Sequence, residues 1–167
     1  RPQGLASCLY RLKSAIPYDF GLYMHQDERR CTLDHLSTLM ANDVVAYDRG
    51  YFSYIMAYRH QQKGVHAIFR LKKNTYESIR NFWKSDDTDA MVTIMPTGQN
   101  LKILVKKYPN IDFKPITLRL IKYYIAGETY CVGTTLFDQN VLPQDFQEAY
   151  HGRWGIEVPQ SHYYQSE

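Results

Sequence analysis

Long apolar runs are absent from this sequence of 167 residues. No stretch reaches the roughly 20 apolar residues that a helix needs to cross a bilayer. No basic-then-apolar leader precedes a cleavage site. With 44% hydrophobic residues, the composition is ordinary for a globular protein. We therefore expect one soluble domain, or most of one, with no membrane partner.

Cysteine is also scarce, with only Cys8, Cys31 and Cys131 present. The number is odd and no Cys-x-x-Cys pair occurs, which indicates a reducing compartment and disfavours a zinc site. We expect three buried thiols. The six histidines show no ligand spacing, so no metal role is expected for them.

Basic residues are concentrated in two segments, although the net charge is only +3. Residues 59–84 contain seven lysines or arginines against the single Glu77, and residues 99–126 contain six against Asp112. A run of charge is often only a solvated face. Segregated basic surface is also what binding to a phosphate backbone requires.

Hydrophobic periodicity predicts a mixed α/β chain with a strand-rich middle. Strands are predicted at 5–14, 18–24, 43–47, 65–71, 90–96, 101–107, 116–125 and 128–136. Helices are predicted at 31–40, 53–63, 75–84 and 143–156. The strand, helix and strand within 43–71 predict a parallel βαβ unit.

The first candidate site lies in residues 43–53, a short buried strand that ends in Asp48 and leads through a glycine turn into a helix. Carboxylates that bind ligands in open α/β sheets commonly follow the carboxyl end of a strand. Aspartate also forms turns and helix N-caps. Both readings of Asp48 stay open.

The second candidate site places Tyr150, Arg153 and Glu157 at i, i+3 and i+7 of the last predicted helix. Side chains at that spacing share one helix face. An arginine fork suits a phosphate and a carboxylate suits a metal ion. The alternative is a surface helix in which Arg153 and Glu157 form an i,i+4 ion pair.

Together the two motifs resemble the DDE transposases of the bacterial group named after insertion sequence four. That group has an Asp-Arg-Gly-Tyr-Phe run, matched by 48–52, and a Tyr-x2-Arg-x3-Glu signature, matched from Tyr150 to Glu157. The resemblance implies that Asp48 and Glu157 are catalytic and hold Mg²⁺ or Mn²⁺. It implies that Arg153 clamps a phosphate, that Tyr150 hydrogen-bonds or stacks beside the DNA strand end, and that Arg49 also binds DNA or its phosphates.

The fold implied by this resemblance is α/β, a ribonuclease H-like core with a β-strand-rich insertion. The implied divisions are core strands and helices at 1–85, the β-rich insertion at 86–138, the glutamate-bearing helix at 139–157 and an irregular tail at 158–167. The family has an earlier catalytic aspartate on a first core strand, for which no counterpart is found here. The signature's lysine falls at Tyr164. We therefore expect a truncated copy in which the first core strand is missing.

The implied reaction is metal-dependent DNA strand cleavage and transfer at transposon ends. The implied partners are terminal inverted repeats and a second transposase on the DNA, in the bacterial cytoplasm at the nucleoid. Without the first aspartate, we expect weak metal binding and no strand transfer. The alternatives are a non-catalytic DNA-binding or transposase-interfering remnant, and an unrelated nuclease of the same fold.

Overall fold

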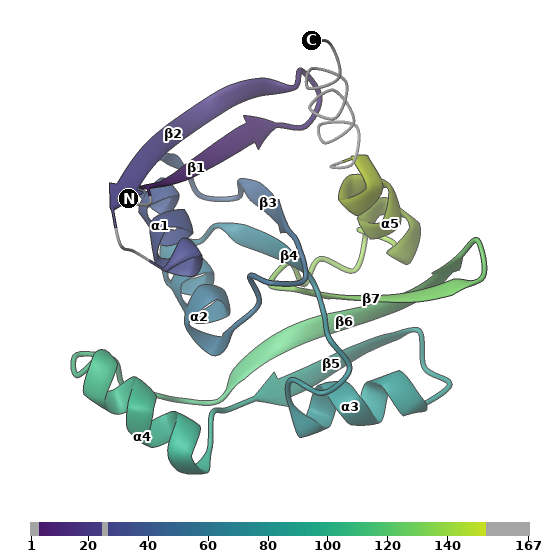
Figure 1. Ribbon diagram of the computed structural model, residues 1–167. Coiled ribbons are helices and arrows are strands. Elements are labelled where there is room, and N and C mark those ends of the chain that lie inside the picture. Colours follow the sequence, from purple (N-terminus) through teal and green to yellow (C-terminus); the bar gives the residue numbers. More distant parts are fainter. Residues whose placement is uncertain (1–3, 25–26, 153–167) are drawn as a thin grey trace, which may run out of the picture.

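The computed structural model describes residues 4–24 and 27–152, which form two β-sheets and five α-helices (Figure 1). The smaller sheet is an antiparallel hairpin of β1 (Gly4–Arg11) and β2 (Ile16–Met24). The larger sheet contains β3 (Val44–Tyr47), β4 (His66–Arg70), β5 (Asp89–Ile94), β6 (Ile116–Ile125) and β7 (Glu128–Thr134), in the order β3-β4-β7-β6-β5. The helices are α1 (Glu28–Asp34), which continues into a 3₁₀ turn η1 (His35–Thr38), α2 (Tyr54–Lys63), α3 (Glu77–Lys84), α4 (Gly98–Lys107) and α5 (Pro143–Gly152).

The predicted βαβ unit is confirmed: β3 and β4 are parallel and α2 connects them. The hydroxyl of Ser53 accepts a hydrogen bond from the Met56 amide at 3.3 Å, which caps the start of α2. Gly64 ends the helix at φ 71°, a left-handed conformation that glycine adopts without strain. Local sequence signals therefore fix both ends of the crossover helix.

Strands β5, β6 and β7 continue the sheet that β3 and β4 begin, because β7 pairs antiparallel with both β4 and β6. The predicted strand at 116–125 is confirmed, and the one predicted at 128–136 is present but ends at Thr134. A two-residue turn joins them, with Ala126 at φ 49° and Gly127 at φ 87°. Two consecutive positive φ angles are typical of a type I′ hairpin turn.

The strand predicted at 101–107 is wrong, because this segment forms helix α4. Leu101, Leu104 and Tyr108 recur at helical spacing and are the half-buried positions. Ile103 and Val105, which suggested a strand, are 53% and 49% exposed. The helical spacing of Leu101 and Leu104 was therefore a better guide to the structure than the strand propensity of Ile103 and Val105.

Element boundaries also differ from the prediction, most clearly at three places. The helix predicted at 31–40 begins at Glu28 and ends in η1, which leaves Met40 exposed. Tyr76, rather than the predicted Thr75, is the residue before α3. The hairpin turns before Ile16, so the predicted turn residues 16 and 17 already belong to β2.

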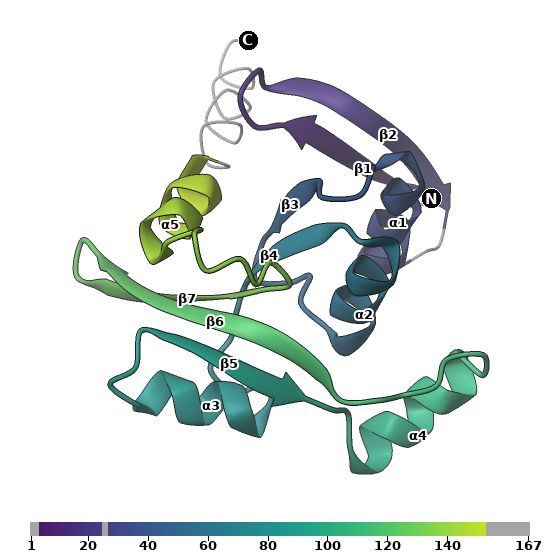
Figure 2. The ribbon, with the colours of Figure 1, turned by 180° about the vertical axis from the view of Figure 1, so that it is seen from behind.

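Two buried clusters cover opposite faces of the larger sheet. Along β4, Ala67 and Phe69 belong to the main core beneath α2 and α3, whereas Ile68 belongs to a second cluster with Phe146 and Tyr150 of α5. Figures 1 and 2 show α5 on one side of the sheet and α3 on the other. No helix in the described part of the chain is long and apolar enough to span a membrane.

A buried histidine joins α2 to β3 within the main core. The His60 imidazole donates from Nδ1 to the Met56 carbonyl at 2.7 Å and accepts from the Tyr47 hydroxyl at Nε2 at 2.9 Å. Burial lowers the pKa of His60 to about 4, so the ring is neutral at physiological pH. Cys31 and Cys131 are buried as expected, and Cys8 is half-buried.

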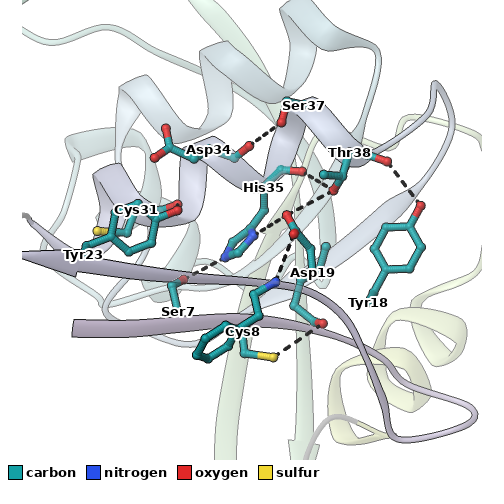
Figure 3. Close-up of polar contacts among 12 residues, drawn as sticks. Ser7, Cys8, Tyr18, Asp19, Tyr23, Cys31, Asp34, His35, Ser37 and Thr38 are labelled. Atoms are coloured by element: carbon teal, nitrogen blue, oxygen red, sulfur yellow. Dashed lines mark hydrogen bonds and ion pairs between the residues drawn. The ribbon is translucent and has the colours of Figure 1, made fainter. Parts of the chain in front are cut away.

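A second histidine holds the β1–β2 hairpin against η1 (Figure 3). His35 is buried, and its Nδ1 donates to the carboxylate of Asp19 at 2.7 Å, while Nε2 lies 2.9 Å from the hydroxyl of Ser7. Asp19 also accepts from the Phe20 amide at 2.9 Å and from the Thr38 hydroxyl. One imidazole therefore connects both hairpin strands to the helical segment.

This network predicts acid sensitivity of the hairpin. The hydrogen bond from His35 is the main cause that lowers the pKa of Asp19. A carboxylate with a depressed folded-state pKa stabilises the protein above its unfolded-state pKa, and this contribution is lost as pH falls through the folded-state value. We expect Asp19→Asn to lower the Tm at pH 7 and to have little effect at pH 3.

Thermal unfolding by circular dichroism at both pH values measures this difference. Asp87→Asn, which changes an exposed carboxylate, should leave the Tm unchanged at either pH. An equal loss of Tm for Asp19→Asn at pH 7 and pH 3 would contradict the assignment.

Candidate functional site

Asp48 is the first residue after β3 and is exposed. Its backbone carbonyl accepts from the Tyr51 amide at 3.1 Å and so closes the turn that follows the strand. Ser53, not Asp48, provides the side-chain cap of α2. The Asp48 side chain is therefore not used as the helix cap, one of the two structural roles considered for it.

Two hydrogen bonds and one aromatic contact fix the turn after Asp48. Tyr51 donates its hydroxyl to the carboxylate of Glu28, and Arg29 Nε donates to the Gly50 carbonyl at 2.8 Å. Phe52 is buried, with its ring 5.4 Å from that of Phe69. Burial, followed by the contact with Glu28, raises the pKa of Tyr51, which therefore stays a protonated donor.

Helix α5 reaches Asp48 from the opposite end of the sequence. The hydroxyl of Tyr150 donates to Asp48 Oδ1 at 3.1 Å, across a separation of 102 residues. The Tyr150 side chain is fully buried, in the cluster that Phe146 forms with the sheet residues Ile68 and Val132. The structure thus brings together one residue from each of the two motifs.

The other predicted site residues divide into two groups. Arg49 is exposed on the turn after Asp48. Arg153 and Glu157 lie outside the described residues, so their predicted roles stay predictions. The predicted DNA contact of Tyr150 also stays a prediction. Its hydrogen bond to Asp48 was not predicted from the sequence.

A cleft of about 870 Å³ lies between the hairpin and β3, beside this site. Asp48, Tyr51 and Glu28 border it together with residues of β1 and β3. Asp48 therefore lines a cleft that is open to solvent.

The basic segments contribute less surface charge than their sequence suggests. Arg119 is buried, its guanidinium donates to Asp89 at 2.6 Å, and its Nη1 also donates to the carbonyls of Asp138 and Val141. Lys122 donates to backbone carbonyls at the end of α3. These two cations have structural roles. The exposed lysines and arginines of the two segments are Arg59, Lys63, Lys72, Lys73, Arg80, Lys84, Lys102, Lys106, Lys107 and Lys114.

The residues in 4–24 and 27–152 alone do not assemble a full metal site, because no group of three or more His, Cys, Asp or Glu side chains converges there. Asp48 has the hard oxygen donors that Mg²⁺ and Mn²⁺ prefer. It supplies one carboxylate, with Oδ1 also accepting from Tyr150. Asp48 fits a metal site as one ligand of several.

Comparison with known families gives a match over nearly the whole chain: the model of the transposase DDE domain aligns with residues 3–162. The chain belongs to this family. A search of curated proteins gives no match. The matched range of the transposase DDE domain includes both Asp48 and Glu157, and such domains generally use divalent metal ions.

Replacing Tyr150 with phenylalanine in this transposase DDE domain tests the contact with Asp48. The substitution keeps the buried ring and removes one hydrogen bond, so we expect a loss of about 1 kcal/mol in unfolding free energy. Urea unfolding measures it. Tyr124→Phe, at an exposed position, serves as the control. Equal effects of the two substitutions would contradict the contact.

Arg119→Ala tests whether this arginine is structural. Removal of the guanidinium leaves Asp89 and two carbonyls without their donor, so we expect a loss of about 3 kcal/mol in stability. Because the charge is buried, the salt dependence of any DNA binding should not change. Urea unfolding and a salt series of gel shifts give both readouts. A reduced salt slope with unchanged stability would contradict the structural role.

Proposed function

We propose that this chain contributes to the catalytic domain of a DNA transposase, in which Asp48 and Glu157 bind a divalent cation beside a DNA strand. The hydrogen bond between Tyr150 and Asp48 is the observation that best supports the proposal. It places the carboxyl end of β3 against the helix that leads into the Tyr-x2-Arg-x3-Glu signature. The substrate is DNA at transposon ends, in the bacterial cytoplasm at the nucleoid.

The spacing of the signature supports the inclusion of Glu157. On a helix, residues seven positions apart lie about 10 Å apart along the axis on the same face. A helical continuation from Tyr150 would direct Arg153 and Glu157 along the face that meets Asp48. In that arrangement Arg153 binds a phosphate bidentately and Arg49 adds a second cation from the turn.

The chemistry of the proposed site follows from its donor set. A bound Mg²⁺ or Mn²⁺ would supply Lewis-acid activation and charge stabilisation at a phosphodiester. Asp48 holds its oxygen donors at the end of a rigid strand, and the buried Tyr150 restricts the rotation of that carboxylate. Arg49 and Arg153 neutralise phosphate charge and orient the strand.

The finer fold assignment belongs to the same proposal. We infer a ribonuclease H-like core and membership of the insertion-sequence-four group, with the core at 1–85, the insertion at 86–138, the glutamate helix at 139–157 and the tail at 158–167. The parallel β3–α2–β4 unit supports the core. Strands β5 to β7 join the same sheet, so the proposed insertion extends the sheet that carries Asp48.

Two carboxylates carry too little negative charge to hold two divalent cations tightly. We therefore propose that these 167 residues alone bind DNA and a metal weakly, and cleave no strand detectably. The exposed lysines and arginines support the DNA contact. A remnant that binds DNA or interferes with an active transposase is the alternative function, and pairing on DNA with a second transposase is part of both.

Gel shifts with a duplex that carries the terminal inverted repeat test the DNA contact. We expect affinity to fall with salt, with a log–log slope of several units, because each phosphate contact contributes about −0.9. A duplex of scrambled sequence is the control for specificity. No shift at low salt would contradict DNA binding.

The same duplex incubated with Mn²⁺ tests activity. We expect no detectable nicking by the chain alone. Clear nicking that is abolished by Asp48→Asn would contradict the expected inactivity while assigning the reaction to Asp48.

A further inference from the structure

Three helices pack on one face of the larger sheet, opposite α5. Ile55 of α2 and Phe82 of α3 are buried in the main core, and Leu104 of α4 packs against it. Helix α5 packs on the second cluster, on the other face. Figures 1 and 2 show α3 and α4 on the side of the sheet away from α5. The outer surfaces of α2, α3 and α4 therefore belong to the same side of the molecule.

Each of these three helices carries two exposed basic side chains that are four positions apart. Residues at that spacing are neighbours on a helix surface, about 6 Å apart. The pairs are Arg59 with Lys63 on α2, Arg80 with Lys84 on α3, and Lys102 with Lys106 on α4. On the opposite face, α5 contains no lysine or arginine and exposes Asp145 and Glu148. The two faces of the sheet thus differ in charge.

The six basic side chains are not neutralised by the described part of the chain. Within residues 4–24 and 27–152, the ion pairs that contain a lysine or an arginine are Lys114–Asp112 and Arg119–Asp89. Glu77 is the one acidic residue in the sequences of α2, α3 and α4. Like charges four positions apart destabilise a helix. An external anion against these helices would remove that repulsion.

The helix dipole explains only one member of each pair. The second member lies in the last turn of its helix, where a positive charge is favourable. The first member lies one turn earlier, and the effect of the dipole falls off within the last turn. A ligand with several negative charges along its length interacts with both members of every pair.

A DNA duplex fits this surface better than a membrane or a single strand does. Gln62 and Asn81 are exposed beside the basic pairs, and amide side chains donate to phosphate oxygens. A helix that binds a membrane surface needs large apolar side chains beside its cations, and α2 and α3 expose none. Single-stranded bases stack on accessible aromatic rings, whereas the aromatic rings of the three helices are buried or half-buried.

The basic pairs lie apart from Asp48. The Asp48 carboxylate lies on the α5 side of the sheet, where it accepts from Tyr150. Helix α2 begins at Tyr54, just after the turn that follows Asp48. With a rise of about 1.5 Å per residue, Arg59 and Lys63 lie roughly 8 and 14 Å along the axis from that start. A duplex on the three helices therefore does not need the carboxylate site.

We propose that α2, α3 and α4 form a second DNA-binding surface, which holds the phosphate backbone of a duplex without sequence preference and apart from the duplex at Asp48. The identity of the polyanion as DNA rests on the proposed function. The location of the surface goes beyond that function. The lack of sequence preference follows from the ligands, because contacts to phosphates carry no sequence information directly.

Fluorescence anisotropy of the full chain with a labelled duplex of scrambled sequence, over a salt series, tests the surface. The duplex has about 30 base pairs, roughly three helical turns. We expect binding that weakens steeply with salt. Each phosphate contact contributes about −0.9 to the log–log slope, so loss of one basic pair should make the slope shallower by up to about 1.8.

Three double variants remove one pair each and should each give that shallower slope, and their combination should abolish binding of the scrambled duplex. The variants are Arg59→Gln/Lys63→Gln, Arg80→Gln/Lys84→Gln and Lys102→Gln/Lys106→Gln.

Two controls separate charge from folding. Arg11→Gln/Lys13→Gln removes the same charge from two exposed residues of the hairpin and should leave the slope unchanged. Arg59→Lys/Arg80→Lys keeps the charge on two of the helices and should bind as the wild type does. Circular dichroism shows whether each variant keeps its helices.

The proposal would be overturned by unchanged slopes in all three glutamine pairs, or by an equal loss in the hairpin control. Single-stranded DNA that binds more tightly than the duplex would also overturn it. So would vesicles containing phosphatidylserine, if they bind as tightly as the duplex and lose binding in the same variants.

A duplex with the terminal inverted repeat distinguishes this proposal from the proposed function. A repeat-specific complex that is weakened by Arg49→Gln, with no binding of the scrambled duplex, would refute the second surface alone. Binding of the scrambled duplex through the helix pairs, with no preference for the repeat and no effect of Arg49→Gln, would support the second surface and contradict the proposed function.

Discussion

The contact between Tyr150 and Asp48 is the interaction on which the site depends. It joins the end of β3 to α5 across 102 residues, and the donor is a fully buried phenol. A buried hydroxyl needs a partner, since an unsatisfied one costs about 1–3 kcal/mol. The hydrogen bond that the buried Tyr150 hydroxyl donates therefore orients the otherwise exposed carboxylate of Asp48.

Packing of the sheet puts α5 in reach of that carboxylate. Strands β4, β6 and β7 contribute Ile68, Ile121 and Val132, respectively. Phe146 and Tyr150 of α5 pack against these three side chains. Because β7 lies between β4 and β6, strands β6 and β7 from the middle of the chain form part of the sheet surface against which α5 packs. The middle segment therefore positions the helix of one motif over the strand of the other.

Much of the fold was predictable where a local signal agreed with tertiary packing. Ser53 and Gly64 mark the start and the end of α2, and the Ala126–Gly127 turn joins β6 to β7. The segment 101–107 was not predictable in this way, because its β-branched residues suggested a strand while its leucines packed as a helix. The site was predictable in part. Asp48 and Tyr150 could be named from the motifs, but their direct contact and the burial of Arg119 depend on long-range packing that no local pattern encodes.

Whether Asp48 and Glu157 hold one divalent cation can be seen in an anomalous difference map from crystals of the full chain grown with Mn²⁺. We expect one manganese peak with a carboxylate oxygen of each residue about 2.1 Å from it. Carboxylates of Asp48 and Glu157 on opposite sides of the molecule, or a manganese bound elsewhere with none between them, would contradict it.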